Sequence, residues 1–178
     1  LEFVQGDIRN YQTCLDALNG INIVSHQAAL GSVPRSIKDP KTSTEVNVLG
    51  TVNLLQACVE KGVDRIVVAF SSSTYGDHPG LPKVEDKFGN PMSPYAVTKA
   101  CIEQFCNVFG DTYGLNWIGL RYFNVFGPKQ NPTNPYAAVI PIFSKAFLHK
   151  EQITVYGNGD TSRDFTYVDN VVEMNMLA

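Results

Sequence analysis

The chain has 178 residues, 44% of them hydrophobic and 17% charged, and a formal net charge of −3. This composition is ordinary for a globular protein, and because no block of like charges is present, we expect neither nucleic acid nor an anionic membrane surface as a partner. No apolar run approaches the roughly 20 residues that span a bilayer.

The amino-terminal residues include neither an initiating Met nor the charged and apolar regions of a signal peptide. We therefore expect the chain to be a segment of a longer protein, truncated at both ends. The four cysteines form no C-x-x-C pair and the three histidines have no ligand-like spacing, so we expect no metal site. Free thiols fit a reducing compartment, and we predict a cytoplasmic location.

Short β-branched runs alternate with longer amphipathic runs along the first two thirds of the chain. Strands are predicted at residues 3–7, 21–25, 65–70 and 116–121. Helices are predicted at residues 11–18, at residues 42–61 and from residue 93 onward. This alternation implies βαβ units with right-handed crossovers, and therefore an α/β fold built on a parallel sheet.

After residue 122 the alternation becomes less regular. A helix is predicted at residues 137–150, short strands at 153–155 and 165–168, and a further helix from residue 169. We interpret this region as the beginning of a second, smaller lobe.

Tyr95 and Lys99 stand four residues apart at the start of a predicted helix, so they lie on the same helix face and can address one site. A free tyrosine is a poor base at neutral pH, but a nearby cation favours its phenolate. The pair alone is a weak signal. It becomes a strong one here because a buried-looking strand that ends in three serines, followed by Tyr75-Gly76, precedes it.

Four of the predicted strands end in clusters of polar or small residues. In an open parallel sheet, ligands bind at the carboxyl ends of the strands, so these clusters together predict a bound cofactor. The clusters are Gly6-Asp7, residues 26–29, residues 71–73 and residues 121–124.

Four runs, SSSTYGDHPGLPKVED, SPYAVTK, LRYFNVFGP and NGDTSRDFTYV, give the chain a specific resemblance. It resembles the extended short-chain dehydrogenase/reductase superfamily and, within it, the nucleotide-sugar 4-epimerases, most of all the bacterial UDP-N-acetylglucosamine 4-epimerase type. The resemblance implies a Rossmann-like doubly wound parallel sheet that binds NAD, in part, over residues 1–124. Residues 125–178 would then be the start of the lobe that binds the nucleotide sugar.

The resemblance implies a catalytic set of Ser71, Tyr95 and Lys99. Tyr95 would be the base, Lys99 would bind the nicotinamide ribose and lower the pKa of Tyr95, and Ser71 would hydrogen-bond the sugar oxygen. The other cofactor contacts that it implies are Asp7, Ile8, Gln27, Ala28, Ala29, Asn47 and Tyr122. The other substrate contacts that it implies are Gly31, Ser32, Ser72, Ser73, Asn124, Gln130, Ala138, Val139, Thr154, Tyr156 and Arg163.

Some of these roles have structural alternatives. Asp7 could cap a helix or a turn, Asn47 could only support the backbone, and Arg163 could form a surface salt bridge. Which of the three serines is catalytic stays open, as does N-acetylation of the sugar. In this superfamily, dimers pack two helices from each subunit. The resemblance therefore implies a homodimer of the full-length protein through helices 42–61 and 93–113.

The chain departs from the superfamily pattern in lacking the glycine-rich phosphate loop and the acidic residue for the adenosine ribose. We therefore expect the 178 residues alone to be inactive. Related dehydratases and decarboxylases carry carboxylates beside their catalytic Thr, whereas residues 71–74 here carry only hydroxyls. This favours 4-epimerisation, and the resemblance implies UDP-N-acetylglucosamine/UDP-N-acetylgalactosamine as the substrate pair. The alternatives are a UDP-glucose or UDP-glucuronate 4-epimerase, a dehydratase, a decarboxylase, or a non-catalytic NAD-binding module.

Overall fold

The computed structural model describes residues 2–133, 137–155 and 157–178. Its contacts divide the chain into two compact units, Leu1–Arg121 with Ala178, and Tyr122–Leu177. Each unit is described by itself. None of the helices in the described ranges is both long enough and apolar enough to cross a membrane.

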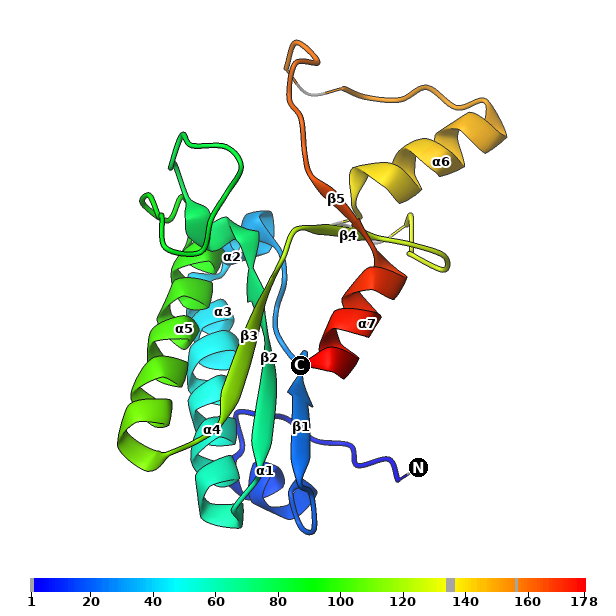
Figure 1. The fold of residues 1–178 in the computed structure, drawn as a ribbon. Helices are drawn as coiled ribbons and strands as arrows, with labels where there is room; N and C mark the ends of the chain where they lie inside the picture. The colour runs from blue at the N-terminus through cyan, green and yellow to red at the C-terminus, as the bar shows by residue number, and fades with distance from the viewer. Residues whose placement is uncertain (1, 134–136, 156) are drawn as a thin grey trace. The chain divides into compact units, whose positions relative to one another are not determined.

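The first unit is built on a three-stranded parallel sheet (Figure 1). Strands β1 (Ile23–His26), β2 (Arg65–Ser71) and β3 (Trp117–Tyr122) follow in that order across the sheet. β1 and β2 run parallel, with Ile23 opposite Arg65 and His26 opposite Val68. This arrangement confirms the predicted α/β, Rossmann-like fold class.

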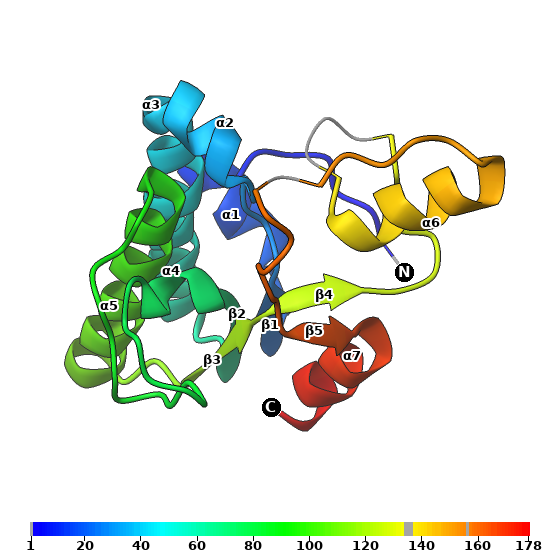
Figure 2. The same cartoon turned by 90° about the horizontal axis from the view of Figure 1, so that it is seen from above.

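Helices α4 (Gly50–Lys61) and α5 (Pro94–Tyr113) cover one face of this sheet (Figures 1 and 2). Alternate residues of β2 are buried against them, as the apolar run in this strand requires. Helix α1 (Tyr11–Ala17) packs on α4 and completes the core. The core side chains that are 1% exposed or less are Leu55, Ala57, Cys58, Ile66, Val68, Ile102 and Cys106.

The predicted long helix over residues 42–61 is interrupted. It consists of α3 (Pro40–Thr44), a π-helical turn at Glu45–Leu49, and α4. A π turn inserts one extra residue into a helix and is often found at functional sites. Gly62, at φ 67°, ends α4 as predicted.

Two predicted strands are not observed, and one helix was not predicted. Residues 3–7 and 153–155 have no regular structure, because neither segment forms a ladder with another strand in the described ranges. Their side chains are largely exposed, with Phe3 at 86% and Val155 at 54%. The additional helix is α2 (Val33–Lys38), which has only six residues.

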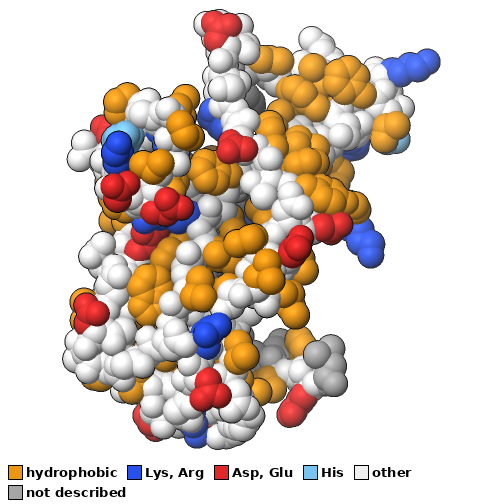
Figure 3. Space-filling model, in the orientation of Figure 1, with side chains coloured by type: hydrophobic (Ala, Val, Ile, Leu, Met, Phe, Trp, Pro, Cys, Tyr) orange, Lys and Arg blue, Asp and Glu red, His pale blue; other side chains and the backbone are white. Residues whose placement is uncertain are grey.

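The second unit contains a small parallel sheet of β4 (Asn124–Phe126) and β5 (Phe165–Tyr167). Phe126 contacts the rings of Phe165 and Tyr167 edge-on. The unit also contains α6 (Val139–His149) and α7 (Val168–Leu177). Many hydrophobic side chains of the chain are exposed (Figure 3), and in this unit Leu148 and Met176 are each 82% exposed.

Candidate active site

The start of α5 presents Tyr95 and Lys99 one helical turn apart. Ser93 caps the helix by accepting a hydrogen bond from the Ala96 N–H at 3.1 Å, and Pro94 occupies the first helical position. Lys99 is 4% exposed, and its Nζ donates to the Ala69 carbonyl oxygen at 2.7 Å. The ammonium group is thereby fixed against β2, near the carboxyl end of the strand.

Burial works against the charged forms of both side chains. It lowers the pKa of Lys99 to about 8, and the negative charge of Glu103 acts in the opposite direction. Burial likewise raises the pKa of Tyr95, while a hydrogen bond with the Ser71 hydroxyl lowers it. The phenolate is therefore favoured by a specific hydroxyl partner in a site that otherwise disfavours charge.

Ser71 ends β2 and is buried, and a short 3₁₀ turn, Ser72–Tyr75, follows it. Its Oγ accepts hydrogen bonds from the Ser73 backbone N–H at 3.2 Å and from the Ser73 hydroxyl at 2.9 Å. With its acceptor sites engaged in this way, Ser71 can use its own proton to donate to Tyr95. Of the three consecutive serines, Ser71 is the one that hydrogen-bonds Tyr95, while Ser72 is half-buried beside it.

Asn47 lies in the π turn and is 1% exposed. Its Oδ1 accepts from the Leu30 N–H at 2.7 Å, and its Nδ2 donates to the Leu30 carbonyl and to the Thr98 hydroxyl. The Thr98 hydroxyl in turn donates to the Tyr95 carbonyl oxygen at 2.8 Å. Asn47 therefore joins the loop after β1 to the helix that carries Tyr95.

The loop after β1 contains the small residues predicted to lie near the cofactor and the sugar. Ala28 and Gly31 are exposed, and Ala29 and Ser32 are half-buried. Ser32 caps α2 by accepting a hydrogen bond from the Arg35 N–H at 3.1 Å. Gln27 is exposed, and its amide group donates to the Ser25 hydroxyl at 3.1 Å.

Asp7 and Ile8 lie apart from the sheet in a turn. The Asp7 carboxylate accepts hydrogen bonds from the backbone N–H of Arg9 and from its guanidinium group, with an Nη2–Oδ2 distance of 2.6 Å. These bonds lower the pKa of Asp7 to about 2. Ile8 packs against the hydrophobic core. The Asp7 carboxylate is thus already paired within the chain.

The remaining predicted contacts belong to the second unit. Tyr122 exchanges a hydrogen bond with Asn175 of α7, and Asn124 Nδ2 donates to the Asp164 carbonyl oxygen at 2.9 Å. Ala138 and Val139, at the start of α6, are exposed, and so is Thr154. Tyr156 lies outside the described residues.

Arg163 is exposed, and its Nη1 donates to the carbonyl oxygen of the neighbouring Ser162 at 2.7 Å. Within the described ranges, its guanidinium group forms no ion pair. The surface salt bridge considered for this residue is therefore not observed there.

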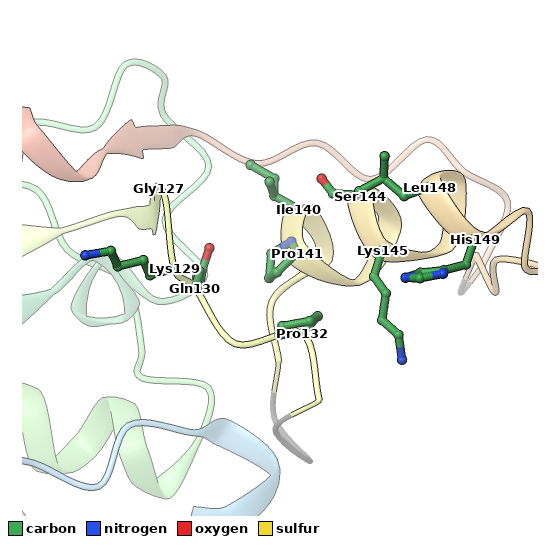
Figure 4. A pocket seen from close by; sticks show the side chains of 10 residues that line it. All are labelled: Gly127, Lys129, Gln130, Pro132, Ile140, Pro141, Ser144, Lys145, Leu148 and His149. Atoms are coloured by element: carbon green, nitrogen blue, oxygen red, sulfur yellow. The ribbon is translucent and has the colours of Figure 1, made fainter.

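A pocket of about 350 Å³ lies between the segment after β4 and helix α6 (Figure 4). Gln130 lines it, with Nε2 donating to the Val125 carbonyl oxygen at 3.2 Å. The Gln130 Oε1 is buried and has no hydrogen-bond partner among the described residues. The other lining residues are Gly127, Lys129, Pro132, Ile140, Pro141, Ser144, Lys145, Leu148 and His149.

In the first unit, sequence reasoning missed a partly buried ion pair between α5 and β3. Arg121 donates to both carboxylate oxygens of Glu103, with an Nη2–Oε2 distance of 2.8 Å, and lies over the rings of Phe88 and Tyr75. The pair holds the segment after the serine turn against α5 and β3. A signal was present, because Glu103 follows Lys99 by one helical turn and so lies on the same helix face.

The residues at the carboxyl end of β2 fit the nicotinamide end of a dinucleotide. A phenol, a hydroxyl and a buried ammonium group gather there, and one N–H of the Lys99 ammonium bonds the Ala69 carbonyl oxygen. Its other N–H groups suit ribose hydroxyls, and the loop after β1 offers small residues for a close approach of the cofactor. The adenine end is less complete, since Arg9 already occupies the Asp7 carboxylate.

The chain is similar to known nucleotide-sugar epimerases. The chain is 36% identical over 181 residues to a putative UDP-glucose 4-epimerase of Methanocaldococcus jannaschii, covering 99% of this chain and 58% of that protein. It is 38% identical to the solved UDP-N-acetylglucosamine 4-epimerase from Methanobrevibacter ruminantium, with a TM-score of 0.93 over 98% of this chain and 56% of that one.

A third similar protein is the UDP-glucose 4-epimerase of Thermus thermophilus, solved in complex with NAD. The identity is 38% and the TM-score 0.90, over 100% of this chain and 60% of that one. The chain thus spans a little over half the length of these relatives. The sequence pattern of the NAD dependent epimerase/dehydratase family matches residues 1–178. The chain belongs to the NAD dependent epimerase/dehydratase family.

Proposed function

We propose that this chain is the catalytic part of an NAD-dependent enzyme that epimerises a UDP-hexose at C4. The observation that carries the proposal is the turn after β2, which places hydroxyl groups beside Tyr95 and contains no carboxylate over Ser71–Thr74. Elimination of water needs a further acid–base group to remove a carbon-bound proton. Epimerisation needs only removal of a hydroxyl proton and a reversible hydride transfer.

In the proposed reaction, bound NAD supplies the acceptor and donor of the C4 hydride. The Tyr95 phenolate takes the proton of the C4 hydroxyl, and with substrate bound Ser71 turns its single proton from Tyr95 to the same sugar oxygen. Lys99 favours the phenolate through its positive charge and holds the ribose with its free N–H groups. The 4-keto sugar then rotates so that its opposite face is presented. Tyr95 returns the proton to the sugar oxygen and is itself a phenolate again.

The proposed cofactor contacts are those at the ends of β1 and β2, together with Asp7, Ile8, Asn47 and Tyr122. For the nucleotide sugar we propose contacts in the second unit, above all Asn124, Gln130 and Arg163. The unpartnered Gln130 Oε1 supports this, because a buried acceptor needs a donor. The forked cation of Arg163 suits a diphosphate.

We favour the pair UDP-N-acetylglucosamine and UDP-N-acetylgalactosamine as substrate. Supporting this choice are the sequence runs around Ser71, Tyr95 and Arg163 and the similarity to the M. ruminantium enzyme. UDP-glucose is the second candidate, and the similarity to the M. jannaschii and T. thermophilus proteins supports it. Activity is proposed for a longer protein that carries this chain, since the chain spans 58% of the M. jannaschii relative.

We further propose that this longer protein is a homodimer that pairs α4 and α5 with their copies. An apolar groove between the π turn, α4 and α5 supports this proposal. Val48, Leu49, Val52 and Phe105 line it, and Leu49 is 50% exposed. Such a face is suited to burial against another helix pair.

The test is an assay of the longer protein with NAD and, separately, UDP-N-acetylglucosamine, UDP-glucose and UDP-glucuronate. The products are identified by NMR at C4. We expect UDP-N-acetylgalactosamine to form fastest. A 4-keto-6-deoxy sugar would contradict the proposal in favour of a dehydratase. No product from any of the three sugars, with NAD bound, would favour a non-catalytic NAD-binding module.

A further inference from the structure

The backbone N–H of Tyr95 has a partner outside its own helix. The first N–H groups of a helix have no acceptor within the helix and need one from elsewhere. In α5, Pro94 has no N–H, the Ala96 N–H is bonded to Ser93, and the Tyr95 N–H donates to Ser36 Oγ at 3.0 Å. Ser36 belongs to α2, so a neighbouring helix completes the cap of the helix that carries the base.

The Ser36 hydroxyl is buried and both donates and accepts a hydrogen bond. It is 0% exposed, and it donates its proton to the Val33 carbonyl oxygen at 2.8 Å. A lone pair is therefore available for the Tyr95 N–H. On the other side, the Tyr95 carbonyl oxygen accepts from the Thr98 hydroxyl, which Asn47 holds at 3.1 Å. Both backbone polar groups of Tyr95 are thus bonded to buried hydroxyls.

We propose that Ser36 is a positioning residue for Tyr95, one that fixes the first turn of α5 so that the phenol stays within reach of Ser71 and Lys99. The inference rests on the proposed function, since it gives Ser36 a role in the same proton transfer. Without Ser36, the partly buried Tyr95 N–H loses its acceptor, and the first turn shifts to recover one. A small displacement of a general base reduces turnover strongly, because proton transfer depends on its geometry.

Ser43 provides a matched control. It is a serine of the neighbouring helix α3, it is 1% exposed, and its hydroxyl donates to the Asp39 carbonyl oxygen of its own helix at 2.9 Å. Ser43→Ala therefore removes an equally buried hydroxyl oxygen and leaves the hydrogen bond of the Tyr95 N–H intact. A general effect of losing a buried hydroxyl should be equal in the two variants.

In the longer protein, Ser36→Ala should lower kcat by between about 10-fold and 100-fold, with KM for the nucleotide sugar unchanged within about twofold. Ser43→Ala should leave kcat within about twofold of the wild type. In a Tyr95→Phe background, Ser36→Ala should cause no further loss, because Ser36 acts through the phenol. Equal kcat values for the two serine variants, or full additivity with Tyr95→Phe, would overturn the inference.

Amide hydrogen exchange supplies a measurement that does not depend on activity. In the wild-type 178-residue chain, the Tyr95 amide should exchange as slowly as amides in the interior of α5, although it lies in the first turn. Ser36→Ala should accelerate this exchange, and Ser43→Ala should not. Fast exchange of the wild-type amide would overturn the inference even if Ser36→Ala did not fold. Slow exchange of this amide, together with a longer protein that binds NAD but has no epimerase activity, would instead contradict the proposed function alone.

Discussion

In the proposed mechanism, Tyr95 acts as a base in surroundings that oppose its ionisation. Burial raises the pKa of this phenol and lowers that of Lys99 to about 8, while Ser71 lowers the pKa of Tyr95 through its hydrogen bond. Basicity therefore depends on groups placed within hydrogen-bonding distance rather than on solvent. A substitution that removes only the phenolic oxygen should therefore test the role of Tyr95 in the reaction without changing the packing of its ring.

Tyr95→Phe in the longer protein should lower turnover by about 10²–10⁴-fold, the usual effect of losing a general base. The ring remains, so the unfolding midpoint should change little. Tyr113→Phe is the control, since it makes the same change on the same helix at a residue that is 53% exposed. Turnover of Tyr95→Phe equal to that of Tyr113→Phe would remove Tyr95 from the mechanism.

His26 makes the stability of the first unit depend on pH. It is 5% exposed, and its Nε2 lies 2.9 Å from the Thr51 hydroxyl oxygen. Burial, with a smaller contribution from the charge of Lys99, lowers the pKa of His26 to about 4 from 6.5. The unfolded chain therefore binds a proton that the folded chain excludes, and stability is lost as pH falls from 6.5 towards 4.

This loss can amount to about 3 kcal/mol between pH 6.5 and pH 4. Urea unfolding of the chain, followed by the fluorescence of its only tryptophan, Trp117, measures it. His26→Gln should flatten the dependence over this interval. The same slope in the variant and the wild type would contradict a buried neutral His26.

At the scale of elements, strong local patterns predicted the structure well. The apolar run of β2 and the capped start of α5 lie within one residue of their predicted positions. The π turn inside the helix at 42–61 was not predicted, because one inserted residue hardly alters the apolar stripe. The strand expected at 3–7 failed because pairing depends on a neighbour, which composition does not reveal.

The candidate site likewise has features that follow from residues close in sequence and features that depend on residues far apart in sequence. The spacing of Tyr95 and Lys99 follows from helix geometry and was predictable. The proposal of Ser71 rather than Ser72 or Ser73 depends on the hydrogen bond between Ser71 and Tyr95, which the sequence does not reveal. The contact from Ser36 to Tyr95 joins residues 59 positions apart, and α2 was too short to be predicted at all.

The segment after the serine turn depends on close backbone packing at Gly76. This residue has φ 56° and ψ −135°, and a Cβ there would lie 2.1 Å from the Asn90 carbonyl oxygen. Gly20 also has a positive φ, 72°, but a Cβ there would meet nothing within 4 Å. Both positions therefore carry a backbone penalty for any side chain, and Gly76 adds a steric overlap that Gly20 lacks.

Gly20→Ala should lower the free energy of unfolding by about 1–2 kcal/mol, the penalty of a left-handed alanine. Gly76→Ala should lower the free energy of unfolding by more. The chain near Asn90 must also move, and the backbone conformation of Gly76 is open essentially to glycine alone. Urea unfolding of the chain measures both. An equal loss in the two variants would show that the packing at Asn90 yields without cost.

At the scale of the whole molecule, the proposed catalytic groups lie in the first unit and most proposed substrate contacts in the second. The 178 residues contain no glycine-rich phosphate loop. The central claim thus concerns the longer protein: C4 of a UDP-hexose is oxidised transiently, and the same hydride returns to the opposite face of the sugar. The claim implies that the hydrogen on C4 never exchanges with water.

The most direct test uses UDP-N-acetylglucosamine that carries deuterium at C4, incubated with the longer protein and NAD in ordinary water. Mass spectrometry and NMR then follow the label in the product. The proposed mechanism predicts UDP-N-acetylgalactosamine that retains the deuterium at C4. Product with a solvent proton at C4, or the absence of any C4 epimer, would contradict it.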